Sequence, residues 1–385
     1  MTTELTPSQP LVPVSVLTGF LGSGKTTLLN YLVHQPCFSD TLAIINEFGE
    51  ISLDHLLVTQ SQEAVVMEMD SGCICCSIRG DLARVLRDIG WRFSRGGKRK
   101  FNRVVIETTG LADPAPILHT LMTDEFIASR YHLDAVITTV DSVNGMQTLD
   151  HHPEAIKQAA VADRLILTKS DLVDEVQLAV LQQRLTQLNP AAQQLRVVKG
   201  EAADLLSLFN TRLFTLDQKT PDVLGWLDES SYAEIPGRSA GPLRYQPVTQ
   251  HAPKKLFQKK PSVQPDANRH DDHIRAFCFT FDHPIDPDLF DQWLSLLMAF
   301  KGPDILRVKG IINLQHRSGA TVIHGVQHIF HPPVELVDWP SADRRTRIVF
   351  ITRDVARLVI ERTFNGFVSS RTEMPSVAAV SGVET

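Results

Sequence analysis

Short apolar runs alternate with longer, partly polar stretches through the first half of the chain. These runs are rich in valine, isoleucine and leucine and have the length of single β-strands; they cover residues 12–18, 42–46, 103–107, 134–141 and 164–168. A helix is predicted after residue 80, where apolar residues recur at i, i+3, i+4 and i+7 as Leu82, Val85, Leu86 and Ile89. Since strands that alternate with helices pair in parallel, we predict an α/β fold with a doubly wound, mostly parallel sheet.

The pattern changes after residue 215. Residues 216–272 are rich in proline, glycine, serine, lysine and glutamine, with few periodic apolar positions, which is typical of a linker or insertion. A strand-like alternation returns at residues 274–281, and a helical pattern follows at 286–300. The remaining pattern predicts three strands and a final helix, over residues 305–314, 320–330, 347–352 and 354–364. The second half therefore predicts a smaller α+β domain.

These changes predict the domain organisation. We expect a first α/β domain over residues 10–215, a linker over 216–272, an α+β domain over 273–365 and a flexible tail over 366–385. A length of 385 residues fits two domains with connecting segments.

Composition and charge narrow the classes of function. The 38 Lys and Arg against 44 Asp and Glu give a formal net charge of −6, which argues against nucleic acid as the main partner. No apolar run approaches the roughly 18 residues of a membrane span. The N-terminus lacks the basic start and apolar core of a signal peptide. We therefore expect a cytoplasmic protein that has no membrane partner.

A phosphate-binding loop is predicted directly after the first strand. Residues 19–26 read GFLGSGKT and match G-x-x-x-x-G-K-[ST], with a strand before the motif and a helical run after it. Glycines let backbone N–H groups converge on phosphate oxygens, Lys25 would reach the β- and γ-phosphates, and Thr26 would ligate Mg²⁺. The residues expected to bind the nucleotide at this loop are Gly19, Gly22, Ser23, Gly24, Lys25, Thr26 and Thr27.

Two later motifs follow strands of the same predicted sheet. Residues 168–171 read TKSD, similar to the [N/T]-K-x-D motif of guanine-binding GTPases, with Thr168 in place of the commoner Asn. Asp171 would accept from guanine, the Lys169 stem would pack against the base, and adenine would be rejected. Residues 107–110 read ETTG. Glu107 would position Mg²⁺ or the attacking water, and Gly110 would offer its N–H group to the γ-phosphate. The alternative for Glu107 is a solvated side chain at a strand end.

Three of the five cysteines lie close together, as Cys73, Cys75 and Cys76 in SGCICCS. Such a cluster in a reducing compartment predicts a metal site that suits Zn²⁺, and also Co²⁺ or Cu⁺. The motif supplies at most three thiolates, which leaves a fourth position for another ligand. Small buried cysteines at a turn, or a redox pair, are the alternatives. The cluster lies between the phosphate loop and ETTG, as does NEFGE, whose Glu50 is a further candidate metal ligand.

The order GFLGSGKTT, NEFGE, GCICC, ETTGLADP and TKSD resembles the CobW-type subfamily of P-loop GTPases, relatives of the nickel-insertion GTPases of hydrogenase and urease maturation. The resemblance implies a P-loop NTPase fold and a GTP-hydrolysing metallochaperone that delivers zinc or cobalt to a client metalloenzyme. It assigns the three clustered cysteines to the metal, residues 19–26 to the phosphates and Mg²⁺, and Lys169 and Asp171 to guanine.

The expected partners are GTP, a divalent metal ion and a client apo-metalloenzyme. No arginine finger is evident, so intrinsic turnover should be slow, and a client or a second copy of the chain in a homodimer would supply acceleration. Three other functions stay open: a cobalt chaperone for cobalamin biosynthesis or nitrile hydratase-type clients, a GTP-binding metal regulator or reservoir, and a small-molecule kinase that prefers ATP. His324 and His328 share one face of a strand-like run, as core residues or as ligands.

Overall fold

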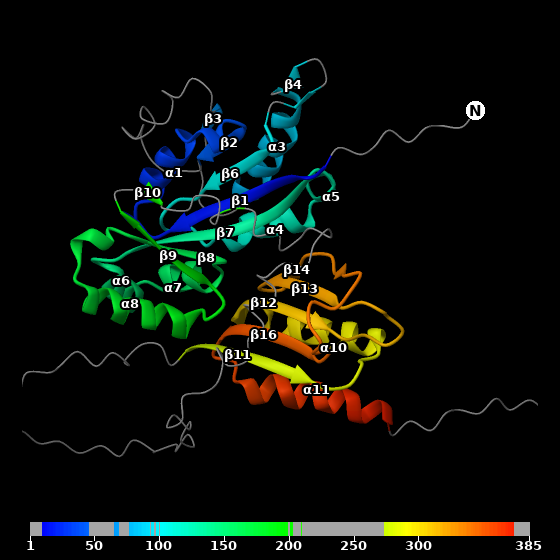
Figure 1. Cartoon of the computed structure of the whole chain (residues 1–385). Helices are drawn as coiled ribbons and strands as arrows, with labels where there is room; N and C mark the ends of the chain where they lie inside the picture. Colours follow the sequence, from blue (N-terminus) through cyan, green and yellow to red (C-terminus); the bar gives the residue numbers. More distant parts are fainter. Residues whose placement is uncertain are drawn as a thin grey trace, which may run out of the picture.

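The computed structural model describes residues 10–45, 65–68, 77–92, 94–95, 98–99, 101–198, 201–202, 209 and 273–372. Its two main sheets are built from separate halves of the sequence and lie next to each other (Figure 1).

The first sheet has eight strands in the order β10-β9-β8-β7-β1-β6-β2-β3. Every pair in it is parallel except β9 with β10, so the predicted doubly wound, mostly parallel sheet is confirmed. The strands are β1 (Val12–Gly19), β2 (Thr41–Ile45), β3 (Val65–Glu68), β6 (Arg103–Glu107), β7 (Tyr131–Asp141), β8 (Arg164–Thr168), β9 (Gln193–Val198) and β10 (Glu201–Ala202). A separate hairpin pairs β4 (Ser94–Arg95) with β5 (Lys98–Arg99).

Helices cover both faces of this sheet, because successive strand side chains point to opposite sides. On one face Leu17 packs with Leu28 and Leu32 of α1, and on the other Val16 packs with residues of α3 and α4. The helices are α1 (Lys25–Val33), η1 (Pro36–Phe38), α3 (Ser77–Arg92), α4 (Ala115–Thr123), α5 (Glu125–Ala128), α6 (Gly145–His151), α7 (Pro153–Ala160), η2 (Ser170–Leu172) and α8 (Glu175–Leu188).

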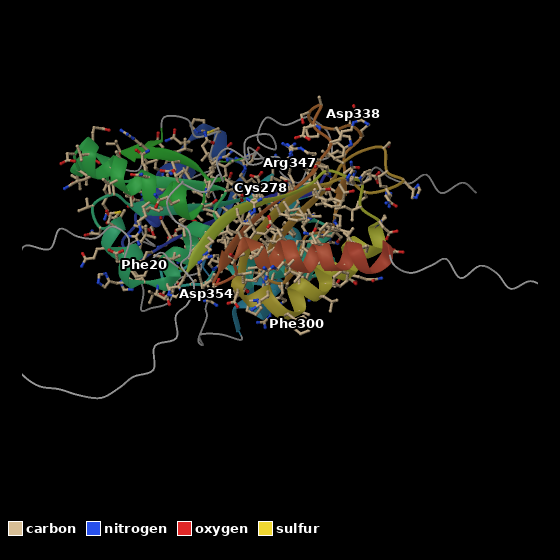
Figure 2. The ribbon with its side chains drawn as sticks, turned by 90° about the horizontal axis from the view of Figure 1, so that it is seen from below. Phe20, Cys278, Phe300, Asp338, Arg347 and Asp354 are labelled. Carbon is tan, nitrogen blue, oxygen red and sulfur yellow. The ribbon has the colours of Figure 1, made fainter. Side chains whose placement is uncertain are left out.

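The second sheet is antiparallel, in the order β11-β16-β12-β13-β14, with β15 paired to β13. Its core forms where α10 and α11 bury Trp293 and Phe364 against Phe350. Phe300, 78% exposed, lies on the surface at the end of α10 (Figure 2). The elements are β11 (Ile274–Phe281), α10 (Pro287–Lys301), η5 (Gly302–Asp304), β12 (Ile305–Ile312), β13 (Thr321–Val326), β14 (Ile329–Phe330), β15 (Val334–Glu335), β16 (Thr346–Arg353) and α11 (Arg357–Thr372).

Two elements differ from the sequence pattern. The run 320–330 is two strands rather than one, because Gln327 has a φ of 54° and turns the chain between β13 and β14. Helix α11 continues to Thr372, past residue 366 where the pattern predicts the tail to begin, because Phe367 and Val368 pack against the same core as Phe364. Within the part of the chain that the structure describes, no helix combines the length and apolarity that crossing a membrane requires.

A buried ionic cluster joins the two sheets. Asp163, directly before β8, accepts hydrogen bonds at 2.6 Å from Arg307 and from Lys309, two alternate residues of β12. All three side chains are buried. Burial acts to raise the pKa of the Asp163 carboxyl, but the two cations and the hydrogen bonds from Lys309 and Val136 N–H outweigh it, so its pKa lies well below the ordinary value. A second contact between the two domains is a hydrogen bond of 3.1 Å from the ring Nε2 of His119 in α4 to the backbone oxygen of Val326 in β13.

Candidate functional site

The phosphate loop connects the carboxyl end of β1 to the first turn of α1, and its glycines at positions 19, 22 and 24 all have a positive φ. Gly19 has a φ of 144°, and a Cβ there would lie 2.3 Å from Thr139 Oγ1 on the neighbouring strand. Gly24, the residue before α1, has a φ of 90° in the left-handed region. The Ser23 and Thr139 hydroxyls share a hydrogen bond of 2.7 Å, which fixes the loop to β7.

The Lys25 side chain folds back over the loop. Its Nζ donates to Gly19 O at 3.0 Å and to Phe20 O at 3.2 Å, and the residue is only 8% exposed. The ammonium group therefore lies at the centre of the loop, where the N-terminus of α1 also favours an anion.

Thr26 and Glu107 come together across the sheet. Leu17 of β1 and Glu107 of β6 are register partners, and Thr108 N donates to Leu17 O, so the end of β6 lies beside the phosphate loop. Thr26 Oγ1 donates to Glu107 Oε1 at 2.7 Å, and Glu107 is buried. A hydroxyl and a carboxylate are hard oxygen donors, and this pair fits Mg²⁺ chemically.

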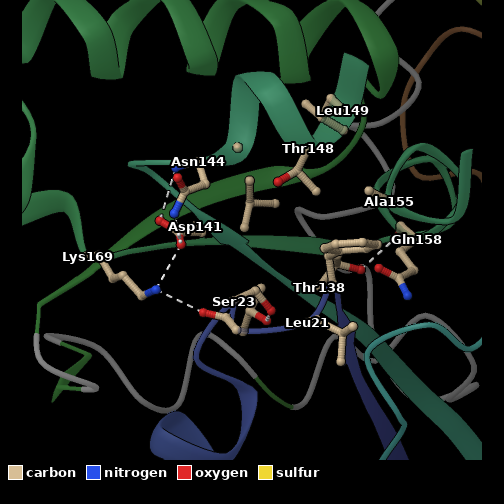
Figure 3. Close-up of a pocket in the computed structure, with 15 residues that line it drawn as sticks. Leu21, Ser23, Thr138, Asp141, Asn144, Thr148, Leu149, Ala155, Gln158 and Lys169 are labelled. Atoms are coloured by element: carbon tan, nitrogen blue, oxygen red, sulfur yellow. Dashed lines mark hydrogen bonds and ion pairs between the residues drawn. The ribbon is translucent and has the colours of Figure 1, made fainter. Parts of the chain in front are cut away.

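The TKSD segment contacts the phosphate loop directly. Thr168 Oγ1 donates to Ser23 O at 2.7 Å, so this hydroxyl supports the loop at the position where Asn is commoner. Lys169, with a φ of 54°, donates from Nζ to Gly22 O at 2.9 Å and to Asp141 Oδ2 at 2.8 Å (Figure 3). Asp171 lies in η2 and is exposed.

Asp141 is a site residue that the sequence reasoning missed. It ends β7 and accepts from Val143 N, Asn144 N and Asn144 Nδ2 as well as from Lys169. Burial acts to raise its pKa, but the hydrogen bonds from Lys169 and Asn144 lower it below the ordinary value. An acidic residue that closes an apolar strand next to the phosphate-loop strand was the available signal.

A cavity of about 270 Å³ lies behind the phosphate loop, between β7, α6 and α7 (Figure 3). Phe20 and Leu21 line it from the phosphate loop, Thr138 lines it from β7, and Gln158 lines it from α7. Phe20 also stacks on His152 at 4.3 Å between ring centroids. Phe20 of the phosphate loop is thus supported by His152, the residue directly before α7.

The proposed metal ligands Cys73, Cys75, Cys76 and Glu50 lie outside the described residues. Within the described ranges, no group of three or more His, Cys, Asp or Glu side chains is placed to hold a metal ion. His324 and His328 do not share a strand face, because the turn at Gln327 separates them. Burial and the neighbouring charges of Lys309 and Arg307 hold the pKa of His324 well below its ordinary value, and these charges disfavour a cation there.

Comparisons with known proteins agree with this arrangement. Residues 13–196 match the CobW/HypB/UreG nucleotide-binding domain, and residues 274–368 match the cobalamin synthesis protein CobW C-terminal domain. The zinc chaperone YjiA of Escherichia coli is 30% identical over 359 residues, which cover 92% of this chain and 98% of that protein. This chain belongs to the CobW/HypB/UreG family. The resemblance inferred from the motifs is thereby confirmed.

Other members of the family match over shorter regions. The zinc chaperone CobW of Pseudomonas aeruginosa is 32% identical over 50% of this chain and 58% of its own length. The zinc-regulated GTPase metalloprotein activator 1 of Dictyostelium discoideum is 29% identical over 58% of this chain and 53% of its own length. Among solved structures, Zn(II)-bound YjiA GTPase from E. coli superposes with a TM-score of 0.63 at 25% identity, over 93% of this chain and 99% of that one.

Proposed function

We propose that this protein is a GTP-hydrolysing metallochaperone, which binds a divalent metal ion, with zinc as the first choice, and transfers it to a client apo-metalloenzyme. The observation that carries the proposal is the convergence of the phosphate loop, Glu107 and the TKSD segment at one edge of the first sheet. Further support comes from a relative that matches along nearly its whole length and is named a zinc chaperone.

Each residue at this edge would have a separate role in GTP hydrolysis. Lys25 would bind the β- and γ-phosphates and offset the charge that develops on the transferred phosphoryl group. Thr26 and Glu107 would hold Mg²⁺, which when bound supplies further charge neutralisation. Gly110 would present its N–H group to the γ-phosphate, and Asp171 would accept from guanine.

The cysteine cluster is the proposed cargo site, with Glu50 as a further ligand. In sequence it lies between β3 and α3, and β3 ends at the same edge of the sheet as the phosphate loop, because β1, β6, β2 and β3 run parallel. A change at this edge on GTP hydrolysis would therefore alter the segment that carries the thiolates. A coupling of about 1–3 kcal/mol would change metal affinity by about 5- to 150-fold.

Replacing Cys75 or Cys76 with alanine is expected to lower Zn²⁺ and Co²⁺ affinity by about 100-fold or more, because a direct ligand matters at least as much as an outer-shell partner. GTP affinity measured in the absence of metal should stay within about twofold, since the coupling acts only when both ligands are bound. Equilibrium dialysis with each metal, and titration with a fluorescent GTP analogue, measure the two quantities. Cys37→Ala is the matched control, because Cys37 is an exposed free thiol that lies well before the cluster in the sequence. Unchanged metal binding in both variants would remove the cargo assignment.

The transfer step separates a chaperone from a reservoir. Zinc-loaded protein mixed with an apo-metalloenzyme that co-purifies from zinc-starved cells should restore enzyme activity with GTP, and about tenfold more slowly with a non-hydrolysable analogue. Equal rates with both nucleotides would leave a metal reservoir as the better description.

A further inference from the structure

Helix α7 holds the segment that follows Glu107. The side chain of Gln158 is fully buried, and its Nε2 donates to Gly110 O at 3.2 Å and to Ala112 O at 3.0 Å. One side-chain amide thus binds two carbonyl groups of residues 108–113, which we call the Gly110 loop. Leaving a buried carbonyl without a hydrogen-bond donor costs free energy, so these two bonds favour one conformation of the loop.

Two more bonds complete this attachment. Lys157 Nζ donates to Asp113 Oδ2 at 3.1 Å, so neighbouring residues of α7 bind both halves of the loop. Thr138 Oγ1 of β7 donates to the backbone oxygen of Gln158 at 2.8 Å, which fixes the helix to the sheet at the same point.

The other side of the Gly110 loop lies against the phosphate loop. A Cβ on Gly110 would lie 2.7 Å from Leu21 N, so the two backbones are in close contact. The Gly110 loop is therefore confined between Leu21 on one side and Gln158 on the other. A shift of the loop toward or away from a γ-phosphate must change the bonds to Gln158.

The last residue of α7 contacts the C-terminal domain. Ala160 packs with Leu306 and Ile351 of the second sheet. Arg307 Nη1 donates to Val161 O at 2.7 Å, directly after the helix. The same short helix thus contacts the Gly110 loop with one pair of residues and the second sheet with its last residue.

We propose that Gln158 is a positioning residue, which sets the Gly110 loop for GTP hydrolysis and links that loop through α7 to the C-terminal domain. The proposal rests on the GTPase function proposed above. Gln158 acts through the backbone of Gly110 and Ala112. The position of the second sheet against Ala160 then affects the loop that senses the γ-phosphate.

The first test replaces Gln158 with methionine, which keeps the side-chain volume and removes both donors. We expect kcat for GTP to fall by about 10- to 100-fold, as for a reacting group displaced by about 1 Å, while KM changes by less than about threefold. The affinity ratio of a non-hydrolysable GTP analogue to GDP should fall about tenfold. An unchanged kcat and ratio would overturn the proposal. A wild-type chain without GTPase activity would instead overturn the proposed function.

Two further variants guard against a general loss of structure. Tyr131→Phe is the matched control, because its buried hydroxyl also donates to a backbone carbonyl, that of Leu86 in α3, which belongs neither to α7 nor to the Gly110 loop. It should lower the melting temperature with kcat within about twofold of wild type. Lys157→Ala removes only a partly exposed ion pair and should fold normally, with kcat lowered about threefold. If Gln158→Met and Tyr131→Phe lower kcat equally, Gln158 has only a structural role.

The link to the C-terminal domain is tested by a double-mutant cycle. Leu306→Ala loosens the contact with Ala160 without touching the first domain's charges. We expect it to lower kcat about threefold in the wild-type background and to have little further effect when Gln158 is methionine, since the linking bonds are then absent. Equal effects in both backgrounds would remove the link through α7.

Discussion

Replacing Lys25 with alanine is expected to lower kcat for GTP by about 10²–10³-fold or more, the cost of removing one preorganised charge-stabilising group. The Lys25 ammonium group lies at 3.0 and 3.2 Å from two loop carbonyls, where phosphate oxygens would enter. No other lysine or arginine belongs to the loop itself, and Lys169, which reaches Gly22 O from outside the loop, is paired with Asp141. Release of inorganic phosphate under saturating GTP measures the effect.

Lys301→Ala is the control for this variant, because Lys301 ends α10 on the second sheet and is exposed. Its kcat should equal that of wild type. A competition experiment on the wild type, with GTP hydrolysis measured in excess ATP, tests the base preference that TKSD predicts. Strong inhibition by ATP, or a Lys25→Ala variant that retains full activity, would contradict the assignment of the site.

Replacing Asp163 with alanine is expected to lower the free energy of unfolding by about 3–5 kcal/mol, because Arg307 and Lys309 would stay buried without their counter-charge. Both cations lie 2.6 Å from the carboxylate and are almost inaccessible to solvent. Denaturant unfolding followed by circular dichroism measures the loss. Asp304→Ala is the control, because its ion pair with Arg353 is much more exposed and should contribute about 0–1 kcal/mol. Equal losses in both variants would contradict the role given to Asp163.

Asp163 also predicts part of the acid sensitivity of the fold. Because its pKa is lower in the folded state, the unfolded chain binds the proton first as the pH falls. The stability that Asp163 contributes is therefore fully present above the ordinary pKa of about 4 and is lost as the pH falls through the folded value. The difference in melting temperature between wild type and Asp163→Asn should shrink as the pH is lowered from about 5 toward 3. A constant difference would contradict the ionic origin of the effect.

The sequence predicts the phosphate loop well because its parts are contiguous. One strand, one glycine-rich turn and one helix hold Gly19, Lys25 and Thr26, and local pattern alone specifies all three. The pairing of Thr26 with Glu107 also follows from the motifs. The phosphate loop follows β1 and Glu107 ends β6, and these two parallel strands end at the same edge of the sheet. The metal-binding role of Cys73, Cys75 and Cys76 stays a prediction.

Residues that join distant segments could not be predicted in this way. Gln158 lies in a helix that the apolar pattern did not indicate, and its partners Gly110 and Ala112 lie more than 40 positions earlier. Asp163 precedes an ordinary apolar strand, and its cationic partners lie 144 and 146 positions later. Nothing local distinguishes these polar residues from solvated ones, because their partners are set by how the strands and domains pack. Lys169 is intermediate, since its motif was evident but its bond to Asp141 was not.

The Asp163 cluster sets a rule for exchanging domains between members of this family. A first domain that carries a buried carboxylate before β8 accepts only a second domain whose facing strand presents cations at two alternate positions, as Arg307 and Lys309 do here. A chimera that supplies apolar residues there would bury an uncompensated negative charge. Whether two such domains are compatible thus depends on three residues at the interface between the sheets. A change at one of them would require compensating changes at the other two.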